Sequence, residues 1–410
     1  MTDYARYEDQ GDLGNREPED ILSPRHYRAV RQDGRLMRAM PLWCYTSERF
    51  YQAEREKIFL SGWNMLERVE VVLQPGDYHA ITFLGIPLLI ARGQDDKVRV
   101  FANTCRHRGA LLAEGSGNCR AFRCPYHFWT YRPDGSFIGA PNYKDPAGKP
   151  LIDDGNKSEF NLAEIESGIW GGFIFIRLKK GAETLERHLG SFVGTLASHR
   201  LEDMVCARKT VWEMDANWKC FIENYIDAYH IPYVHMNSLA QWQTTDYEVV
   251  PQRGAETVVF ARHEGSQLLL PGDDYVGFPP MPQLDKDKAG GTYFTTLRPG
   301  FLMTLGNDGA LVFQSEPISA RKSRLTVSSL FPRAYLARPD FDALAQNYYR
   351  RNDLVVGEDK EIALRQYAGL QSPYARIARL CNEETNLSIF ANWIVDQVVG
   401  PERSETIAAE

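Results

Sequence analysis

Apolar and polar positions follow one pattern up to about residue 178 and a different pattern after it. Between about residues 50 and 178 the apolar positions form short runs, such as 98–102 and 169–176, which turn residues separate. The tetrapeptide Arg-Pro-Asp-Gly at 132–135 is one of these turn signals. This pattern predicts a small all-β domain that ends in a buried strand.

After about residue 180, strand-like stretches are interspersed with longer helical ones. The apolar spacing predicts helices at 217–231, 338–368 and 373–399, and Asn307-Asp308-Gly309 predicts a hairpin turn. The Pro-, Gly- and Asp-rich segment 265–291 is expected to be a long loop and is a candidate lid. We therefore expect an α+β chain, whose second part is an antiparallel sheet around long helices. Its strands are predicted near 206–214, 246–263, 292–299, 301–306, 310–318 and 323–331.

Composition restricts the class of protein. The 410 residues, 43% of them hydrophobic and 12% aromatic, suffice for two globular domains. The mean hydropathy is −0.40, and no apolar run reaches the ~18 residues of a membrane span. The polar, acidic N-terminus and the seven cysteines without a paired framework predict a cytoplasmic protein with reduced thiols. A net charge of −7 argues against nucleic acid as a partner, and we expect no membrane partner.

Two short segments carry the strongest chemical signal. The segments CRH at 105–107 and CPYH at 124–127 each combine one cysteine with one histidine. Two thiolates and two imidazoles are the ligands of a Rieske [2Fe–2S] cluster, in which cysteines hold one iron and histidines the other. A closed zinc site uses the same atoms, but known zinc sites pair cysteine with cysteine and histidine with histidine, so the pattern favours the cluster. The predicted cluster ligands are Cys105, His107, Cys124 and His127.

A second metal site is predicted around two histidines. On a regular helix His230 and His235 would point ~140° apart, but Pro232 is expected to end the helix between them. His235 can then turn back towards His230. Two histidines and one carboxylate form the facial triad that binds non-haem Fe(II) and leaves positions open for O2.

Asp359 is the carboxylate that best completes this triad. Its four predicted helical neighbours, three and four positions away in each direction, are all apolar, and a carboxylate on such a face is costly unless it is paired or binds a metal. Glu358 lies off this face and is the next candidate. We therefore assign His230, His235 and Asp359 to a mononuclear Fe(II). The four neighbours are Val355, Val356, Ile362 and Ala363.

The segments CRHRGA at 105–110 and CPYHFWTY at 124–131 closely resemble the cluster loops of one family. This family comprises the large (alpha) subunits of Rieske non-haem iron oxygenases, the aromatic ring-hydroxylating dioxygenases, and the order of elements is similar over nearly the whole chain. The resemblance implies a helix-grip (START-like) catalytic domain after an all-β Rieske domain. One departure is Phe128, where the family usually has a small residue; Phe128 and Trp129 are expected to form an apolar cover beside His127.

The domains expected on this basis are an N-terminal arm at 1–45 that packs on the catalytic domain, a Rieske domain at 46–178 and a catalytic domain at 179–410. The catalytic domain would hold the mononuclear iron.

Asp227 is the residue expected to connect the two metals. It precedes His230 by three residues, so the two side chains are predicted to share a helix face, and ligating histidines normally donate their second N–H to a carboxylate. In the family this aspartate bridges the iron histidine to a cluster histidine of the neighbouring subunit. The resemblance therefore implies a path from His127 of one chain through Asp227 to His230 of the next, in a homotrimer with or without a separate beta subunit. The alternative is that Asp227 only caps or solvates the helix.

The resemblance implies a terminal oxygenase. Electrons would come from NAD(P)H through a separate reductase, with or without a ferredoxin, because no GxGxxG motif opens a helix here. We expect O2-dependent hydroxylation or dihydroxylation of an aromatic, in some cases carboxylated, compound, as in aromatic hydrocarbon catabolism. The alternative is a monooxygenase that demethylates or cleaves an N-methyl or quaternary-ammonium substrate. Two other classes are a Rieske electron carrier and a zinc-stabilised ligand-binding protein.

Several residues are candidates for the substrate pocket. Apolar side chains on the predicted strands and the last helix suit an aromatic ring, or a cage for a trimethylammonium group. Arg298 is a candidate partner for a substrate carboxylate, but a surface or structural role is favoured for it. The apolar candidates are Phe294, Phe301, Met303, Phe313, Phe390 and Trp393.

Overall fold

The computed structural model describes residues 16–32, 36–239, 246–272 and 276–401. It contains two compact units. The β-rich unit comprises Trp63–Leu185 with Arg200–Asp203, and the mixed unit comprises Met1–Gly62, Glu186–His199 and Met204–Glu410. The division differs from the expected boundaries, because residues 46–62 group with the mixed unit and the β-rich unit extends past residue 178.

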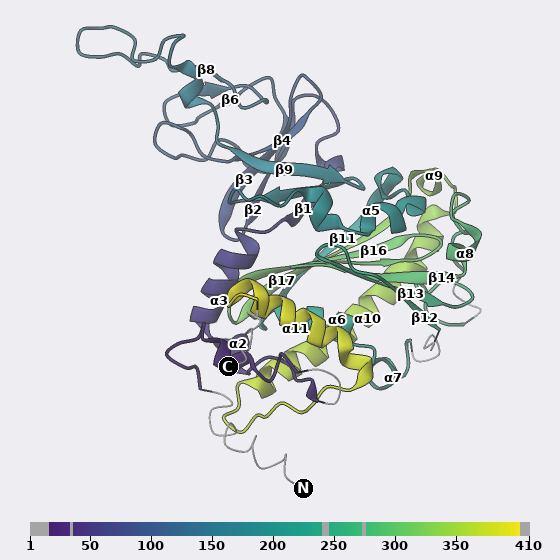
Figure 1. The fold of residues 1–410 in the computed structure, drawn as a ribbon. Coiled ribbons are helices and arrows are strands. Elements are labelled where there is room, and N and C mark those ends of the chain that lie inside the picture. Colours follow the sequence, from purple (N-terminus) through teal and green to yellow (C-terminus); the bar gives the residue numbers. More distant parts are fainter. Residues whose placement is uncertain (1–15, 33–35, 240–245, 273–275, 402–410) are drawn as a thin grey trace, which may run out of the picture. The chain divides into compact units, whose positions relative to one another are not determined.

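The β-rich unit is built from two antiparallel sheets (Figure 1). A seven-stranded sheet has the order β1-β10-β9-β4-β3-β2-β5, and a small sheet has the order β6-β7-β8. Gly171 and Gly172 both have positive φ and form the two-residue turn between β9 and β10, a position where glycine costs least. The strands are β1 (Asn64–Arg68), β2 (Asp77–Phe83), β3 (Ile86–Arg92), β4 (Val98–Ala102), β5 (Ser116–Asn118), β6 (Phe122–Arg123), β7 (Thr130–Tyr131), β8 (Phe137–Gly139), β9 (Glu164–Trp170) and β10 (Phe173–Arg177).

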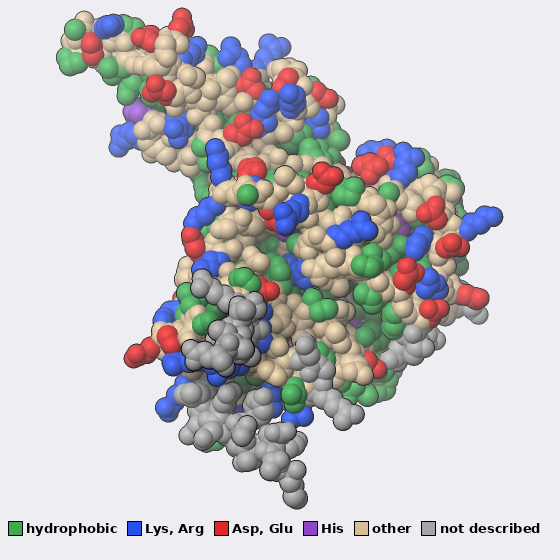
Figure 2. Space-filling model, viewed as in Figure 1, with side chains coloured by type: hydrophobic (Ala, Val, Ile, Leu, Met, Phe, Trp, Pro, Cys, Tyr) green, Lys and Arg blue, Asp and Glu red, His purple; other side chains and the backbone are tan. Residues whose placement is uncertain are grey.

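One aromatic core holds the β-rich unit together at the small sheet. Trp129, Tyr131 and Phe137 are buried and pack in the same cluster as Cys105 and Cys124. The two cysteine-bearing loops are therefore anchored in a packed interior. Acidic and basic side chains are interspersed on the visible surface of this unit (Figure 2).

The mixed unit is a seven-stranded antiparallel sheet with long helices against it (Figure 1). The strands follow chain order from β12 to β17, and β11 pairs with β17 at the far edge. Helices α10 and α11 both pack on α6 beside the sheet. The predicted α+β class is confirmed. The strands are β11 (Met204–Met214), β12 (Tyr247–Val250), β13 (Glu256–Arg262), β14 (Gly291–Leu297), β15 (Phe301–Leu305), β16 (Ala310–Ser319) and β17 (Lys322–Pro332).

The long helices of the mixed unit are α6 (Trp218–Ile226), α10 (Phe341–Leu370) and α11 (Thr385–Val398). The shorter α-helices are α2 (Trp43–Thr46), α3 (Glu48–Glu54), α4 (Leu185–Leu189), α5 (Phe192–Thr195), α7 (Ile231–Val234), α8 (Lys286–Ala289) and α9 (Arg333–Leu336). The remaining helical turns are η2 (Pro24–Tyr27), η4 (Arg55–Phe59), η5 (Val69–Val71), η6 (Lys157–Phe160), η7 (Ala197–His199), η8 (Leu201–Asp203) and η10 (Asn382–Glu384). Among the described helices, none combines the length and apolar content of a membrane span.

Two predicted helices have different bounds in the structure. The helix predicted at 217–231 ends at Ile226, because Asp227 has an extended backbone with φ −88° and ψ 124°. The helix predicted at 373–399 begins only at Thr385. Pro373 disfavours the helical conformation of the residue before it, so α10 ends at Leu370 and an irregular segment precedes α11.

The segment before the β-rich unit is fastened to α6 by buried charges. Lys219 Nζ lies 2.7 Å from Glu54 Oε1, and both side chains are fully buried. The Tyr45 hydroxyl donates a hydrogen bond of 2.7 Å to Glu223 on the same helix. Burial raises the pKa of Glu223 to about 7. Because a broken buried pair leaves a charge without a partner, these contacts hold α2 and α3 firmly on α6.

Candidate metal centres

The two cysteine–histidine loops of the β-rich unit have the same backbone geometry. The Cys105 amide donates to the Ala110 carbonyl at 2.8 Å, and the Gly109 amide donates to the Cys105 carbonyl at 2.9 Å. In the second loop the Cys124 amide donates to the carbonyl five residues on, and the amide four residues on donates back to Cys124, at 2.8 and 3.0 Å. The residue four positions after each cysteine has positive φ, +75° at Gly109 and +57° at Phe128.

This repeated geometry brings the four predicted cluster ligands together. The His107 and His127 Nδ1 atoms are 3.2 Å apart, and the Cys105 and Cys124 side chains are buried and interact with each other. Burial raises the pKa of the Cys105 thiol, so a thiolate at this position needs a nearby positive charge such as iron. The loops thus present two sulfur and two nitrogen atoms to one place.

Phe128 does not form the expected cover over His127. Its side chain is 56% exposed and lies near Arg123, whose guanidinium is 5.7 Å from the ring centre. The cause is the left-handed backbone at this position, which is equivalent to Gly109 and accounts for a preference for glycine there. The ring of Tyr126 contacts His127 instead, at 3.8 Å between centroids, and Trp129 is buried and stacks on His107.

One tyrosine reaches the sulfur side of this site. The Tyr131 hydroxyl lies 3.3 Å from Cys105 Sγ and accepts a hydrogen bond of 3.0 Å from the Arg106 amide. The Arg106 amide donates to a lone pair of the Tyr131 hydroxyl oxygen. The hydroxyl hydrogen is therefore available to donate to Cys105 Sγ. Hydrogen bonds to cluster sulfurs influence the reduction potential of iron–sulfur sites.

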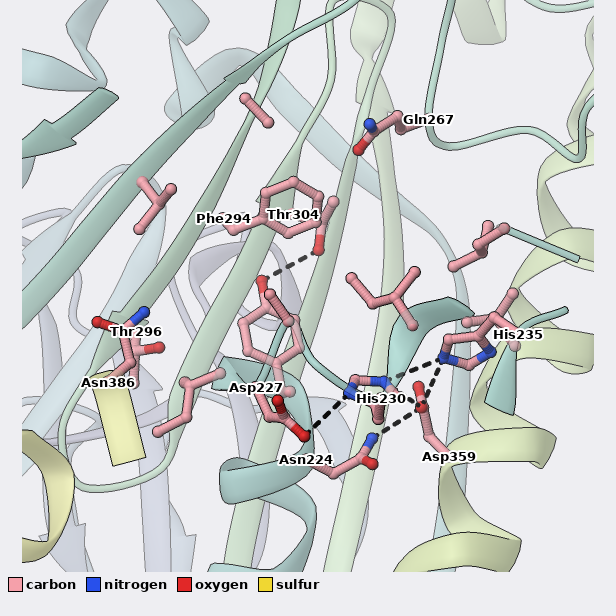
Figure 3. A pocket seen from close by; sticks show the side chains of 18 of the residues that line it. Asn224, Asp227, His230, His235, Gln267, Phe294, Thr296, Thr304, Asp359 and Asn386 are labelled. Carbon is pink, nitrogen blue, oxygen red and sulfur yellow. Dashed lines mark hydrogen bonds and ion pairs between the residues drawn. The ribbon is translucent and has the colours of Figure 1, made fainter. Parts of the chain in front are cut away.

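In the mixed unit, His230, His235 and Asp359 form a compact set of donors (Figure 3). Their ligand atoms all lie within 4.8 Å of one another. His230 Nε2 and His235 Nε2 are 3.3 Å apart, and Asp359 Oδ1 is 2.9 Å from His235 Nε2 and 3.6 Å from His230 Nε2. His230 lies in the loop after α6, directly before α7. His235 directly follows α7 as its C-cap, and Asp359 lies on α10.

Further groups hold these donors in place. Glu358 Oε2 lies 2.8 Å from His235 Nδ1 and accepts the Ser238 hydroxyl at 2.6 Å. The Asn224 amide donates to Asp359 Oδ1 at 2.7 Å. Asp227 Oδ2 is 3.4 Å from His230 Nδ1, an ion-pair distance whose geometry does not make a hydrogen bond. Both histidines therefore turn Nε2 towards Asp359 and Nδ1 towards another carboxylate.

The charges of this site favour a bound cation. Burial alone would lower the pKa of His230, but Asp227 and Asp359 raise it to about 9. Burial would raise the pKa of Asp359, yet His230 and His235 hold it below its usual range. Three carboxylates thus surround two imidazoles. A divalent metal ion at Asp359 would balance this negative charge, so the donor set fits Fe(II).

Comparison with known proteins assigns both units to one family. The family described as "Rieske [2Fe-2S] domain" matches residues 62–152, and "Ring hydroxylating alpha subunit (catalytic domain)" matches residues 201–400. The chain belongs to the Rieske oxygenase alpha-subunit family. It is therefore a Rieske-type oxygenase whose cofactors are a [2Fe–2S] cluster and a mononuclear iron, with O2 as a substrate.

Several relatives of this Rieske oxygenase are monooxygenases. Chloroplastic choline monooxygenase from Spinacia oleracea is 27% identical over 341 residues, 82% of this chain and 72% of that protein. The carnitine monooxygenase oxygenase subunit from Acinetobacter pittii is 32% identical over 194 residues, 47% of this chain and 51% of that protein. A crystal structure of the quaternary ammonium Rieske monooxygenase CntA has the same fold, with a TM-score of 0.73, 23% identity, and coverage of 93% of this chain and 98% of that chain.

The backbone that brings Asp227 close to His230 is a turn and not the predicted helix. The two residues do not share a helix face, since α6 ends at Ile226 and the residues between them form a turn. The Tyr229 amide donates to Asp227 Oδ1 at 2.6 Å and orients the carboxylate within this turn. Pro232 does not end the long helix either; it lies in the first turn of α7.

Sequence reasoning missed the role of Glu358. It was expected as the second choice for the metal carboxylate, but it lies beside His235 Nδ1 and Ser238. Adjacent residues on a helix point about 100° apart, so Glu358 and Asp359 approach His235 from different sides. The adjacent acids Glu358 and Asp359 indicate in the sequence that two carboxylates lie near the metal site. The sequence does not show which ring nitrogen of His235 each carboxylate faces.

A cavity lies beside the donors of the Rieske oxygenase (Figure 3). Its volume is about 170 Å³, and it is partly open to solvent. Tyr225, Tyr247, Phe294 and Phe313 supply aromatic surface, while Gln267 belongs to the predicted loop at 265–291. The cavity thus combines aromatic walls with polar groups next to the metal donors. Other polar side chains around it are Thr296, Thr304 and Asn386.

The sequence prediction of the pocket is right for two of the six apolar residues. Phe294 and Phe313 line the cavity. Phe301 and Met303 lie on β15 in alternation with Thr304, which does line it, so their side chains point to the other face of the sheet. Phe390 and Trp393 are likewise not among the lining residues.

Arg298 fits the structural role that the sequence favoured over contact with a substrate carboxylate. It does not line the cavity; it is buried, bonds weakly to backbone carbonyls of Gly254 and Glu256, and lies 5.5 Å from the ring centre of Trp393.

Proposed function

We propose that this Rieske oxygenase is a monooxygenase that acts on a substrate with an N-methyl or quaternary-ammonium group. The observation that carries the proposal is the similarity to choline monooxygenase, which extends over 82% of the chain. The earlier alternative thus has more support than the aromatic substrate first expected. The aromatic side chains in the cavity support it too, because a trimethylammonium group binds favourably over aromatic faces.

In this proposal Cys105, His107, Cys124 and His127 hold the cluster, and His230, His235 and Asp359 hold the iron. When bound, the metals supply electron transfer and O2 activation for insertion of oxygen into a C–H bond. Hydroxylation of an N-methyl carbon gives a carbinol that splits into formaldehyde and the demethylated amine. Hydroxylation of another carbon bonded to nitrogen splits that C–N bond into an aldehyde and an amine, and hydroxylation of a more distant carbon only adds one oxygen.

The chain's own residues would position the substrate and fix the ligands. Tyr225 is held rigidly, since its hydroxyl donates to the Met303 carbonyl at 2.8 Å and lies 3.0 Å from Thr304 Oγ1. Phe294 and Phe313 complete an aromatic surface on the β-sheet side. Glu358 and Asp227 face the Nδ1 atoms of the ligating histidines, which leaves Nε2 available for metal.

Asp227 has a second proposed role. One of its oxygens faces His230, and the carboxylate would bridge to His127 of a neighbouring copy in a homotrimer. Electrons would reach the cluster from NAD(P)H through a reductase, with or without a ferredoxin. The exposed tyrosine ring beside His127 and the partial exposure of this histidine are compatible with contact to another protein at this loop.

The test is a single-turnover experiment. Chemically reduced, iron-loaded protein is exposed to O2 with a mixture of trimethylammonium compounds, aromatic acids, arenes and methoxyarenes, and products are identified by mass spectrometry. We expect a trimethylammonium compound to lose a methyl group, to be cleaved at a C–N bond or to gain one oxygen. An identical sample without O2 is the control. Products formed only from arenes or aromatic acids would overturn the proposed substrate class and restore the aromatic one.

A further inference from the structure

A buried arginine lines the cavity of the mixed unit. Arg351 lies on α10 two helical turns before Asp359, with Val355 between them, and all three residues line the cavity. Residues four positions apart lie on the same side of a helix, so α10 presents a cation and the metal carboxylate to one space. By helical rise the two backbone positions are ~12 Å apart.

The guanidinium of Arg351 has no partner among the described residues. The residue is only 6% exposed, and its Nε has no hydrogen-bond partner. Burial lowers its pKa to about 10, and the negative charge of Asp359 acts in the opposite direction. Asp359 does not pair with Arg351, because its carboxylate already contacts His230, His235 and Asn224.

Other buried arginines of the chain differ in this respect. Arg177 is paired with Glu166 at 2.7 Å and also donates to the Gly181 carbonyl at 2.6 Å. Arg298 donates, though weakly, to the Gly254 and Glu256 carbonyls, and it does not line the cavity. A buried cation without a partner is costly, and the cost is removed when an anion binds. Arg351 is therefore placed as the receptor for an anionic group that enters the cavity.

We infer that Arg351 binds the carboxylate of a zwitterionic substrate whose ammonium group lies against the aromatic walls near the metal donors. This inference rests on the proposed function and refines it from any quaternary ammonium to an ammonium carboxylate. The guanidinium fork matches a carboxylate with two parallel hydrogen bonds, which a neutral amide or alcohol cannot replace. The carboxylate end would then fix which methyl or methylene group faces the iron.

The first test compares ligands on the unmodified holoenzyme. Binding of 4-(trimethylammonio)butanoate, its two- and three-carbon homologues and the matching carboxamides is measured by calorimetry without O2. Benzoate and benzamide form a second pair, and choline is a ligand without a carboxylate. We expect at least one acid to bind about 10- to 100-fold more tightly than its amide.

The second test changes the protein. Arg351→Gln should abolish the difference between acid and amide and leave the affinity for choline unchanged, while Arg351→Lys should retain part of the difference. Arg350→Gln removes the same charge from the exposed neighbouring position and should keep the difference in full. If the arginine served only to stabilise the fold, Arg351→Gln would lower the thermal midpoint without changing the acid-to-amide ratio.

The outcomes separate this inference from the proposed function. If benzoate, but no trimethylammonium acid, shows an Arg351-dependent advantage over its amide, the carboxylate site stands and the proposed substrate class falls. If trimethylammonium compounds are converted but acids and amides bind equally, the carboxylate site is wrong and the proposed function stands. An acid-to-amide difference that persists in Arg351→Gln, or no binding of any acid, also overturns the site.

Discussion

Two histidine pairs of this chain have nearly the same distance between their facing ring nitrogens but different surroundings. His107 and His127 approach each other through Nδ1 at 3.2 Å, and His230 and His235 approach through Nε2 at 3.3 Å. The second pair faces carboxylates through its other nitrogens, at 3.4 Å from Asp227 and 2.8 Å from Glu358. Among the described residues, no carboxylate pairs with the first two histidines.

The difference appears in the charge of the two sites. Burial, the neighbouring imidazole and Arg108 lower the pKa of His107, whereas Asp227 and Asp359 raise the pKa of His230 to about 9. The first pair is therefore suited to bind as neutral ligands with one ring edge directed outwards. The second pair lies in a negative environment that favours a cation and fixes each tautomer. In the proposed function, the same residue type would hold the electron-transfer cluster at one site and the oxygen-activating iron at the other.

Removal of one ligand from each site should have the largest effect. His230→Ala should reduce iron from three to two per chain and retain the visible spectrum of the cluster, whereas Cys124→Ser should leave one iron. Each variant should lower turnover at least about a thousandfold, because several kcal/mol of transition-state stabilisation depends on the metals. Metal analysis and steady-state assays measure both effects. Two irons in the unmodified chain would indicate an electron carrier, and zinc without iron would indicate a binding protein.

Asp227→Asn tests the carboxylate that faces His230. The variant keeps the shape and a hydrogen-bonding group, so both metals should remain bound, while coupled turnover should fall about 100-fold if Asp227 forms the proposed bridge to His127 of a neighbouring copy. Rapid-mixing measurements of cluster oxidation, alongside product formation, locate the defect at electron transfer. Asp340→Asn is the matched control on an exposed aspartate. Normal coupled turnover in Asp227→Asn would refute the bridging role.

Glu358→Gln tests the carboxylate that faces His235. We expect iron affinity at the mononuclear site to fall about 10-fold, since the acid fixes the ring and increases its basicity, with no change in the cluster. Iron titration with a competing chelator measures the change. Glu361→Gln, on the exposed side of the same helix, should behave as the unmodified protein. Equal affinity in both variants would show that Glu358 has no part in holding the metal.

Tyr131→Phe tests the hydroxyl that lies near Cys105 Sγ. Loss of the hydroxyl near Cys105 Sγ should lower the cluster potential by about 20 to 60 mV, the equivalent of one hydrogen bond in a one-electron couple. A redox titration followed by visible absorption measures the shift. Tyr143→Phe is the control, because that ring contacts His107 by its edge and not the sulfur. An unchanged potential would show that the Tyr131 hydroxyl does not donate to the sulfur.

Local pattern and ligand chemistry determined much of this protein from the sequence alone. Short alternating runs predicted the strands, because each strand buries one face over few residues. The loops at 105–107 and 124–127 stand out because a cluster needs two thiolates and two imidazoles from short segments. Asp359 stands out because four apolar helical neighbours surround a charged group. Each of these signals is contained within a few consecutive residues.

Only the tertiary structure decided how distant segments complete each site. Glu358 meets His235 and Arg351 enters the cavity through the packing of α10, more than a hundred residues further along the chain. The end of α6 at Ile226 and the exposure of Phe128 follow from backbone conformations that propensity alone does not predict. Such features depend on which surfaces are buried together, and pairing between distant segments has no local periodicity. For that reason the family and the carboxylate beside His230 could be predicted from the sequence, whereas the carboxylate beside His235 and the position of Arg351 in the cavity could not.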